Sequence, residues 1–204
     1  MCKICKMQTE PLMLRGLKYH YCSNCGFLAK DDRLIVSLDK EYERYKLHHN
    51  DLDLGYQNYQ NQFLEAIKPF LRGKIFDFGC GDNHVLSTLL AQNGFASFYY
   101  DKFFYKDLAV FNQKYGTIIL EEVIEHLAYP LETLKKLATI LTKDGVFIIR
   151  TNLFNEKTNL ENWWYLRDIT HLSFFQEKTF LEICKSLLLH FIYSNGKDII
   201  ILGK

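Results

Sequence analysis

From Phe63 onward, apolar runs of strand length alternate with amphipathic segments of helix length, and this alternation constrains the fold more than any other feature. Strands are expected at 74–81, 96–101, 115–122 and 145–152, and helices at 63–71, 85–94, 123–141 and 179–189. Pro130 divides the third helical segment into two pieces, and residues 143–145 are expected to form a turn. Residues 190–204 are expected to form a terminal strand pair. Repeated strand–helix units predict an α/β fold with a parallel sheet and helices on both faces.

The length of 204 residues allows one principal domain and a small module. We expect a module at 1–40, a helical connector packed on the core at 41–62, and the main domain at 63–204. The 25 basic and 24 acidic residues leave a net charge of +1, which excludes a global positive field for holding nucleic acid. Because no apolar run approaches ~20 residues and the first residues lack a secretory pattern, we expect a cytoplasmic protein without a membrane partner.

Four of the six cysteines form two Cys-x-x-Cys pairs, Cys2/Cys5 and Cys22/Cys25. This spacing is typical of a structural zinc site, in which two backbone knuckles aim four thiolates at one point. Gly26 supplies the permissive backbone that such a knuckle requires. The residues between the pairs are expected to form a small hairpin that needs a metal to be stable. The alternatives are ordinary packing cysteines or a redox pair, and the latter leaves one of the two pairs unexplained.

The segment 77–83, DFGCGDN, follows the first predicted strand of the main domain. Gly79 and Gly81 allow the backbone to approach a ligand closely. A dinucleotide fingerprint would require glycine where His84 stands, so NAD is disfavoured. Asp101 ends the next strand, where a carboxylate can accept hydrogen bonds from ribose hydroxyls. An adenosyl ligand without a pyrophosphate fits this pattern best.

The ordered series DFGCG, YYD and EEVIEHLAYPLETLKKLATILTKDGVFIIRTN resembles class I S-adenosylmethionine-dependent methyltransferases over about residues 63–204. Within that family the chain is similar to bacterial proteins with an N-terminal zinc module and undefined substrates. Their connector motif RY…HxN…GY stands here as Arg44-Tyr45, His48/His49-Asn50 and Gly55-Tyr56, and a second shared string is NWWYLRDITHLSFF. The resemblance implies a Rossmann-like, mostly parallel sheet with an antiparallel last strand, a zinc-ribbon-like module, and S-adenosylmethionine as cofactor.

The resemblance also implies a cofactor site. Asp77, Gly79 and Gly81 would line the methionine part, Asp101 would bind the ribose, Lys102 and Phe103 would flank the adenine, and Glu121 would border the sulfonium. The chain departs from the family at Asn83, where the last glycine of the loop is expected, although asparagine tolerates left-handed geometry. The alternative role for the two aspartates is helix capping or turn formation.

Glu122, Glu125 and His126 follow the third strand at a spacing of i, i+3 and i+4, which would place them on one face of a helix beside the cofactor. Glu122, His126 and His171 are therefore the catalytic candidates, with His171 as a general base or a fourth ligand. A divalent ion at Glu122, Glu125 and His126 would lower the pKa of a substrate hydroxyl. A similar E-x-x-E-H block is a metal site in small-RNA terminal 2′-O-methyltransferases and in quinone-ring O-methyltransferases. The alternative is a set of loop-bracing hydrogen bonds and helix-capping carboxylates.

The principal expectation for function is methyl transfer to a small-molecule acceptor. The segment with Trp163, Trp164, Tyr165, Arg167 and Asp168 lies where the family places its substrate lid, although each tryptophan alone is equally well explained by core packing. One alternative is an RNA methyltransferase whose zinc module contacts RNA, against which the near-zero charge counts. The other is a non-catalytic interaction protein whose altered loop no longer binds the cofactor.

Overall fold

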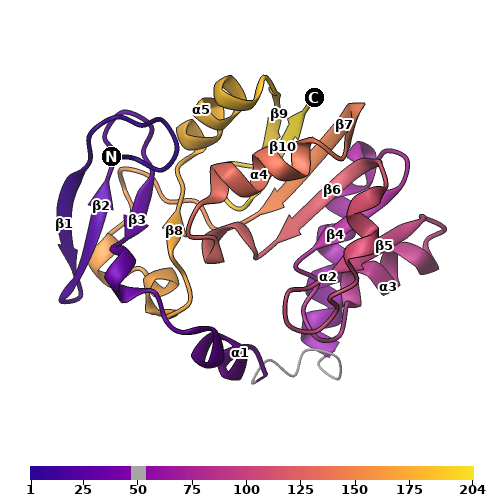
Figure 1. Ribbon diagram of the computed structural model, residues 1–204, viewed down its shortest axis with the longest axis horizontal. Coiled ribbons are helices and arrows are strands. Elements are labelled where there is room, and N and C mark those ends of the chain that lie inside the picture. The colour runs from indigo at the N-terminus through magenta and orange to yellow at the C-terminus, as the bar shows by residue number, and fades with distance from the viewer. Residues whose placement is uncertain (47–53) are drawn as a thin grey trace.

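The computed structural model describes residues 1–46 and 54–204, and within them a six-stranded sheet has the order β5-β4-β6-β7-β10-β9 (Figure 1). Its strands are β4 (Ile75–Phe78), β5 (Ser97–Tyr100), β6 (Tyr115–Glu121), β7 (Leu141–Arg150), β9 (His190–Ser194) and β10 (Ile199–Gly203). The first four in this order are parallel, while β10 pairs antiparallel with both β7 and β9. The expected mostly parallel sheet with an antiparallel last strand is confirmed.

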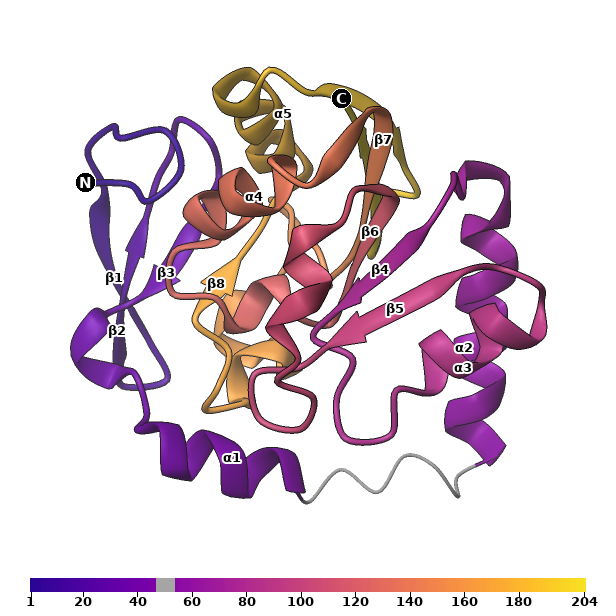
Figure 2. The ribbon, with the colours of Figure 1, turned by 45° about the vertical axis from the view of Figure 1, so that its right-hand side comes forward.

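Neighbouring residues of a strand point to opposite faces of the sheet. Because both sets are apolar and buried in β6, helices cover both faces. Ile119 of β6 packs in one apolar cluster with α2 (Leu54–Ile67) and α3 (Val85–Gln92). Ile118 and Leu120 pack in a second cluster with α4 (Pro130–Ala138) and α5 (Glu177–Leu187). Figures 1 and 2 show the two helix pairs on opposite sides of the strands. The parallel strands therefore end together at one edge, where the loops that follow them meet.

Three local expectations were wrong. Residues 143–145 were expected to form a turn but belong to β7, which begins at Leu141. Next to them the pairing of β7 with β6 shifts its register. The first helical piece around Pro130 is only a 3-10 turn, Ile124–His126. The helix expected over 63–71 ends at Ile67, because Pro69 cannot continue it and opens a 3-10 turn instead.

A second sheet joins the N-terminal module to the main domain. It contains β1 (Glu10–Leu14), β2 (Leu17–Tyr21), β3 (Leu28–Lys30) and β8 (Ser173–Phe174), in that order. The expected hairpin is β1–β2, whereas β8 comes from the far end of the chain and pairs antiparallel with β3. Phe27 of the module packs in the same apolar cluster as Phe175 and Phe180. The cysteine module and the large sheet thus share one hydrophobic core.

The connector contains α1 (Leu38–Lys46) and the beginning of α2. The His48/His49-Asn50 part of the connector motif lies outside the described residues. Among the residues that are described, no helix is both long and apolar enough to span a bilayer. In Figure 2, α1 runs along the edge of the molecule at which β4 and β5 end, so it borders the loops that follow these strands.

Candidate active site

A cavity of about 670 Å³ lies at the carboxyl edge of the parallel strands. Its walls come from the loops after β4, β5 and β6, from α1, and from the segment 164–171. The size falls within the usual range for pockets that enclose a small ligand. Its lining residues fall into two groups, one from the loops after β4 and β5 and one from the end of β6 with the segment 164–171, and we call the parts that they line the two halves of the cavity.

The glycine loop has the backbone that a ligand-binding turn needs. Gly79 and Gly81 have φ angles of +87° and +70°, a region that other residues adopt at a cost. A Cβ atom at Gly79 would lie 2.5 Å from Val123, whereas at Gly81 nothing lies within 4 Å. The space beside Gly81 is therefore open, and the backbone there can contact a ligand directly.

Asp101 faces Gly81 across this half of the cavity. Its carboxylate accepts hydrogen bonds from the backbone N–H of Gly81 at 3.2 Å and from that of Phe103 at 2.8 Å. The side chain thus also closes a turn, which was the alternative role considered for it. Lys102 lines the cavity and pairs with Glu41 of α1 at 2.7 Å. Both Phe103 and Phe104 pack against tyrosines of α1, but Phe104 is the ring that lines the cavity, where Phe103 was expected.

Two buried carboxyl groups lie deeper in the wall. Asp77 accepts a hydrogen bond from the Ser87 hydroxyl at 2.9 Å, and burial raises the pKa of Asp77 to about 7. Glu121 accepts a hydrogen bond from the Gln60 amide at 2.9 Å and pairs with Arg150 at 3.2 Å. Burial raises the pKa of Glu121 to about 8 even though the guanidinium opposes this shift. Both groups can hold or release a proton near neutral pH.

Past the end of β6, a tyrosine hydroxyl bridges two glutamates. Tyr165 Oη lies 2.6 Å from Glu125 Oε1 and 3.0 Å from Glu122 Oε2. Because the hydroxyl carries one hydrogen, it can donate to only one of the carboxyl groups at a time. Burial raises the pKa of both glutamates, and the repulsion from Glu122 raises that of Glu125 further. Glu122 also has a φ angle of +50°, a strained backbone of the kind found at functional sites.

Two neutral histidines complete this half. His126 Nδ1 lies 3.2 Å from the carbonyl oxygen of Thr170, and His171 Nδ1 lies 2.8 Å from that of Tyr165. A carbonyl only accepts, so both Nδ1 atoms carry the hydrogen and both Nε2 atoms keep a lone pair. Burial lowers the pKa of His126 to about 3 and that of His171 to about 4. The imidazole centroids are 4.7 Å apart.

The second group of possible metal ligands differs from the expected one in one member, because His171 takes the place of Glu122. Ligand atoms of Glu125, His126 and His171 lie within 4.8 Å of one another, and Glu122 is not part of this group. The reason is local: Glu122 precedes the 3-10 turn and has a left-handed backbone, so the helical spacing rule does not apply to it. Glu125 Oε2 is fully buried behind the cavity lining and has no hydrogen-bond partner among the described residues.

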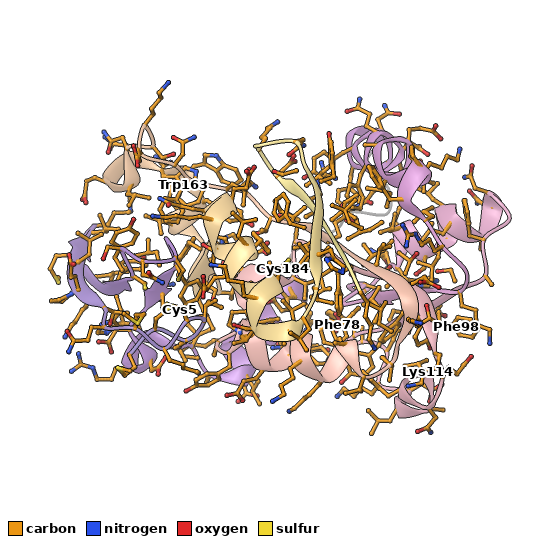
Figure 3. The ribbon with its side chains drawn as sticks, turned by 90° about the horizontal axis from the view of Figure 1, so that it is seen from above. Cys5, Phe78, Phe98, Lys114, Trp163 and Cys184 are labelled. Atoms are coloured by element: carbon orange, nitrogen blue, oxygen red, sulfur yellow. The ribbon has the colours of Figure 1, made fainter. Side chains whose placement is uncertain are left out.

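The two neighbouring tryptophans, Trp163 and Trp164, lie in different surroundings. Trp163 packs against Phe154 and Phe174 in an apolar cluster. Figure 3 shows Trp163 on the same side of the molecule as Cys5 of the cysteine module. Trp164 is 59% exposed and lines the cavity together with Arg167. Of the two tryptophans, Trp164 is therefore the one placed to contact a ligand in the cavity.

Sequence reasoning missed the residues that hold these groups in place. Gln60 and Arg150 orient Glu121, and the Arg150 guanidinium lies 3.6 Å from the ring centroid of Tyr59. Tyr165 was noted only as a lid aromatic, although it bridges Glu122 and Glu125. No motif marks these side chains. The one indication in the sequence is the strand expected at 145–152, which places Arg150 near the edge of the sheet where the site lies.

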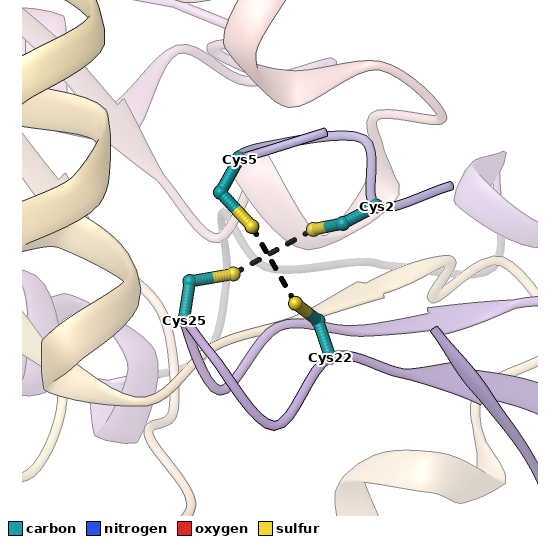
Figure 4. Close-up of side chains that lie close together, drawn as sticks. All are labelled: Cys2, Cys5, Cys22 and Cys25. Atoms are coloured by element: carbon teal, nitrogen blue, oxygen red, sulfur yellow. Dashed lines mark hydrogen bonds between the residues drawn. The ribbon is translucent and has the colours of Figure 1, made fainter. Parts of the chain in front are cut away.

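The four module cysteines converge on one point (Figure 4). The sulfur atoms of Cys2 and Cys25 are 3.6 Å apart, and those of Cys5 and Cys22 are 3.5 Å apart. A tetrahedral site with metal–sulfur bonds of about 2.3 Å has sulfur–sulfur edges slightly longer than this. Lys6 and Gly26, each following the second cysteine of a pair, have φ angles of +63° and +72°, so both knuckles turn in the same way. The donor set and its shape fit zinc.

The sheet, the glycine turn after β4 and the acid after β5 define a Rossmann-like class of nucleotide-binding enzyme. The chain matches the family model described as "Methyltransferase domain" over residues 53–187. It therefore belongs to this family and is a class I S-adenosylmethionine-dependent methyltransferase. No curated protein matched the chain in sequence.

Solved structures share the fold. The 1,6-didemethyltoxoflavin-N1-methyltransferase of Burkholderia thailandensis, with bound 1,6-didemethyltoxoflavin and S-adenosylhomocysteine, has a TM-score of 0.56 and 12% identity, covering 97% of this chain and 99% of that one. A SAM-dependent methyltransferase from Archaeoglobus fulgidus has a TM-score of 0.54 and 17% identity, covering 72% and 94%. Magnesium protoporphyrin IX methyltransferase from Synechocystis PCC 6803 with bound SAH has a TM-score of 0.52 and 16% identity, covering 81% and 94%. Identities this low establish the fold alone.

Proposed function

We propose that the protein transfers a methyl group from S-adenosylmethionine to a small-molecule acceptor in the cavity at the edge of the sheet. The observation that carries this proposal is the joining of two chemically different halves in one cavity. The glycine loop and Asp101 line one half, and Glu122, His126 and His171 line the other. Methyl transfer needs this arrangement, because the nucleophile must be aligned with the methyl carbon and shielded from water.

The first half would hold the cofactor, which supplies an electrophilic methyl group on sulfur. The open backbone at Gly81 and the carboxylate of Asp101 suit a ribose and its neighbouring atoms. Asp77 and Glu121 would lie along the methionine part, and Lys102 with Phe104 would border the adenine. That the Burkholderia and Synechocystis proteins hold S-adenosylhomocysteine supports this assignment.

The second half would hold and activate the acceptor. The Nε2 atoms of His126 and His171 carry lone pairs at neutral pH and can accept a hydrogen bond from an acceptor hydroxyl or amine and orient it toward the methyl group. Glu122, which lines the same half and whose pKa is raised by burial, would take the proton that the acceptor loses, while the Tyr165 hydroxyl holds its carboxylate in place. Trp164 would cover a planar acceptor at the opening of the cavity.

A divalent ion fits the same half. Glu125 Oε2 has no partner in the part of the chain that the structure describes, and two imidazoles with fixed tautomers offer the nitrogens that Mn²⁺ and related ions accept. An ion held there would lower the pKa of an acceptor hydroxyl. Calorimetry with Mn²⁺ should show at least about tenfold weaker binding in Glu125→Gln and little change in Glu122→Gln. Equal losses in the two variants would restore Glu122 as a ligand, and no binding to the wild type would refute the ion.

Zinc at Cys2, Cys5, Cys22 and Cys25 is proposed as a structural ion. The shape of the sulfur cluster and the two matching knuckles support it. Metal analysis of the purified protein should find about one zinc per chain. A protein purified without any bound metal, yet fully folded, would refute this part of the proposal.

Calorimetry with S-adenosylhomocysteine tests the cofactor assignment. The wild type should bind one molecule, and Asp101→Ala should bind about 100-fold more weakly, because two hydrogen bonds to a charged acceptor are lost. Asp107→Ala, which changes an exposed aspartate in the same loop region, is the control. No binding to the wild type would favour the non-catalytic alternative.

RNA is the second acceptor class to test. Transfer of a labelled methyl group to a small-molecule extract, compared with total RNA, separates the two. We expect label in the small-molecule fraction and no salt-dependent RNA retention on filters, since the net charge is +1. Labelled RNA would overturn the small-molecule assignment.

A further inference from the structure

A continuous series of backbone hydrogen bonds runs from the cysteine module into the acceptor half of the cavity. The N–H of Lys30, at the end of β3, donates to the carbonyl of Leu172 at 2.9 Å. The N–H of Leu172 in turn donates to the carbonyl of Glu125 at 2.7 Å. Residue 172 follows His171 directly, so the module is two hydrogen bonds away from the cluster of Glu125, His126 and His171.

The Lys30 side chain strengthens this connection. Its residue is 4% exposed, and its ammonium group donates to the carbonyl oxygen of Ile169 at 3.0 Å and lies 3.5 Å from that of Asp168. Asp168 also accepts from the Thr170 N–H and pairs with Arg44 at 2.9 Å. A buried lysine is costly, and burial lowers the pKa of Lys30 to about 8. Here the charged group lies against the loop that carries His171, where it bonds two successive backbone carbonyls.

The module end of this connection is anchored at the cysteines. Thr179 Oγ donates to the carbonyl of Cys25 at 2.8 Å, and Lys178 donates to that of Ser23. The strand β3 that carries Lys30 begins three residues after Cys25 and pairs with β8. A shift of the second knuckle would therefore move β3, Lys30 and the 168–172 loop together.

We propose that Lys30 is a positioning residue for the acceptor half of the cavity, through which the cysteine module sets the position of His171. This inference rests on the proposed function, since it names the half that would bind the acceptor. Lys30 makes its hydrogen bonds to the 168–172 loop, whereas the cofactor half is built on β4 and β5. The module thus acts as a structural part of the acceptor site, beyond its contribution to stability.

Histidine-ring NMR on full-length protein tests the proposal. The chain has seven histidines, and His126→Gln and His171→Gln assign the two ring signals of interest. Lys30→Met should shift both signals and speed exchange of the Leu172 amide by about tenfold or more, the effect of losing one to two hydrogen bonds. Lys30→Arg should restore both readouts, because it keeps a buried cationic donor. Affinity for S-adenosylhomocysteine should stay within about twofold.

Lys18→Met is the matched control. Lys18 lies on the neighbouring strand, its side chain is 41% exposed, and its ion pair with Asp31 spans 4.0 Å, so its loss should move neither histidine signal. Unchanged signals in Lys30→Met, equal shifts in Lys18→Met, or no rescue by arginine would overturn the proposal. If the wild type binds no S-adenosylhomocysteine, the methyltransferase assignment fails, while the histidine readout still decides the role of Lys30.

A second measurement needs no variant. In the unmodified protein the amides of Lys30 and Leu172 lie on one path, so they should open together and give the same exchange free energy. Clearly different values would show that the module and the loop move separately and would contradict the inference.

Discussion

The two halves of the cavity are built in opposite ways. The cofactor half comes mainly from one continuous stretch, residues 77–105, to which the end of β6 adds Glu121. Within this stretch the loops hold each other, because Asp101 accepts from Gly81 and the Tyr105 hydroxyl donates to the carbonyl of Asp82. The acceptor half is assembled from segments far apart in the chain, including Lys30, Arg44 and the 164–172 region. A half made of local contacts withstands distant changes, whereas an assembled half depends on every segment that supports it.

The largest effect is expected from Cys22→Ser, which breaks the support of the acceptor half. Loss of a zinc ligand should abolish metal binding and lower the unfolding free energy by about 5 kcal/mol or more. Metal analysis and thermal melting measure both. Cys184→Ser, which changes a buried cysteine outside the cluster, should keep the metal. Unaltered zinc content in Cys22→Ser would contradict the four-thiolate site.

The next effect concerns the cofactor half and its buried acid. The pKa of Asp77 is raised to about 7, so the folded state keeps its proton while the unfolded chain ionises near pH 4. Stability from this group is present below pH 4 and is lost as the pH rises through about 7. Asp77→Asn removes the titration and should be about 2–4 kcal/mol more stable than wild type at pH 8, with little difference at pH 4.

Urea unfolding across pH 4–8 measures this difference. The exposed Asp144→Asn change, made on β7, is the control and should leave the pH profile as in the wild type. A constant offset between Asp77→Asn and wild type at all pH values would show that Asp77 does not retain its proton in the folded protein.

A smaller effect separates the two loop glycines. Gly79→Ala should cost about 2–3 kcal/mol, because the new methyl group meets Val123 in a left-handed backbone. Gly81→Ala should cost only about 1 kcal/mol in stability, since its methyl group enters open space, and should mainly weaken cofactor binding. Chemical unfolding and calorimetry on both variants measure the pair. If Gly81→Ala lost more stability than Gly79→Ala and bound S-adenosylhomocysteine as tightly as the wild type, the space beside Gly81 would not be the cofactor site.

The smallest effect on stability is expected at Trp164. Its side chain is 59% exposed, so Trp164→Ala should change the unfolding free energy by less than about 0.5 kcal/mol. The buried Phe174→Ala change at the same end of the molecule should cost about 3–5 kcal/mol. A large loss in Trp164→Ala would assign it to packing and remove it from the acceptor half.

The sequence predicted, for a physical reason, that the glycine loop and Asp101 follow neighbouring strands and meet at one edge of the sheet. Strand, turn and acid lie within one repeating unit there, so periodicity and glycine placement are enough to locate Gly79, Gly81 and Asp101. The four cysteines were located from their spacing, because two Cys-x-x-Cys pairs are typical of a cluster that converges on one point.

The acceptor half was predicted only in part. The helical spacing of Glu122, Glu125 and His126 failed because the left-handed backbone at Glu122 precedes a single 3-10 turn. The pairing of β3 with β8 joins residues about 145 positions apart, and no local pattern encodes such a contact. No motif marks Lys30, and only that pairing places it under the loop.

The structure of the protein with bound S-adenosylhomocysteine tests the central claim most directly. We expect the ribose at Asp101, the backbone of Gly81 against the ligand, and the sulfur atom facing His126 and His171. A ligand whose sulfur points away from both histidines, or which binds outside this cavity, would contradict the assignment of the two halves.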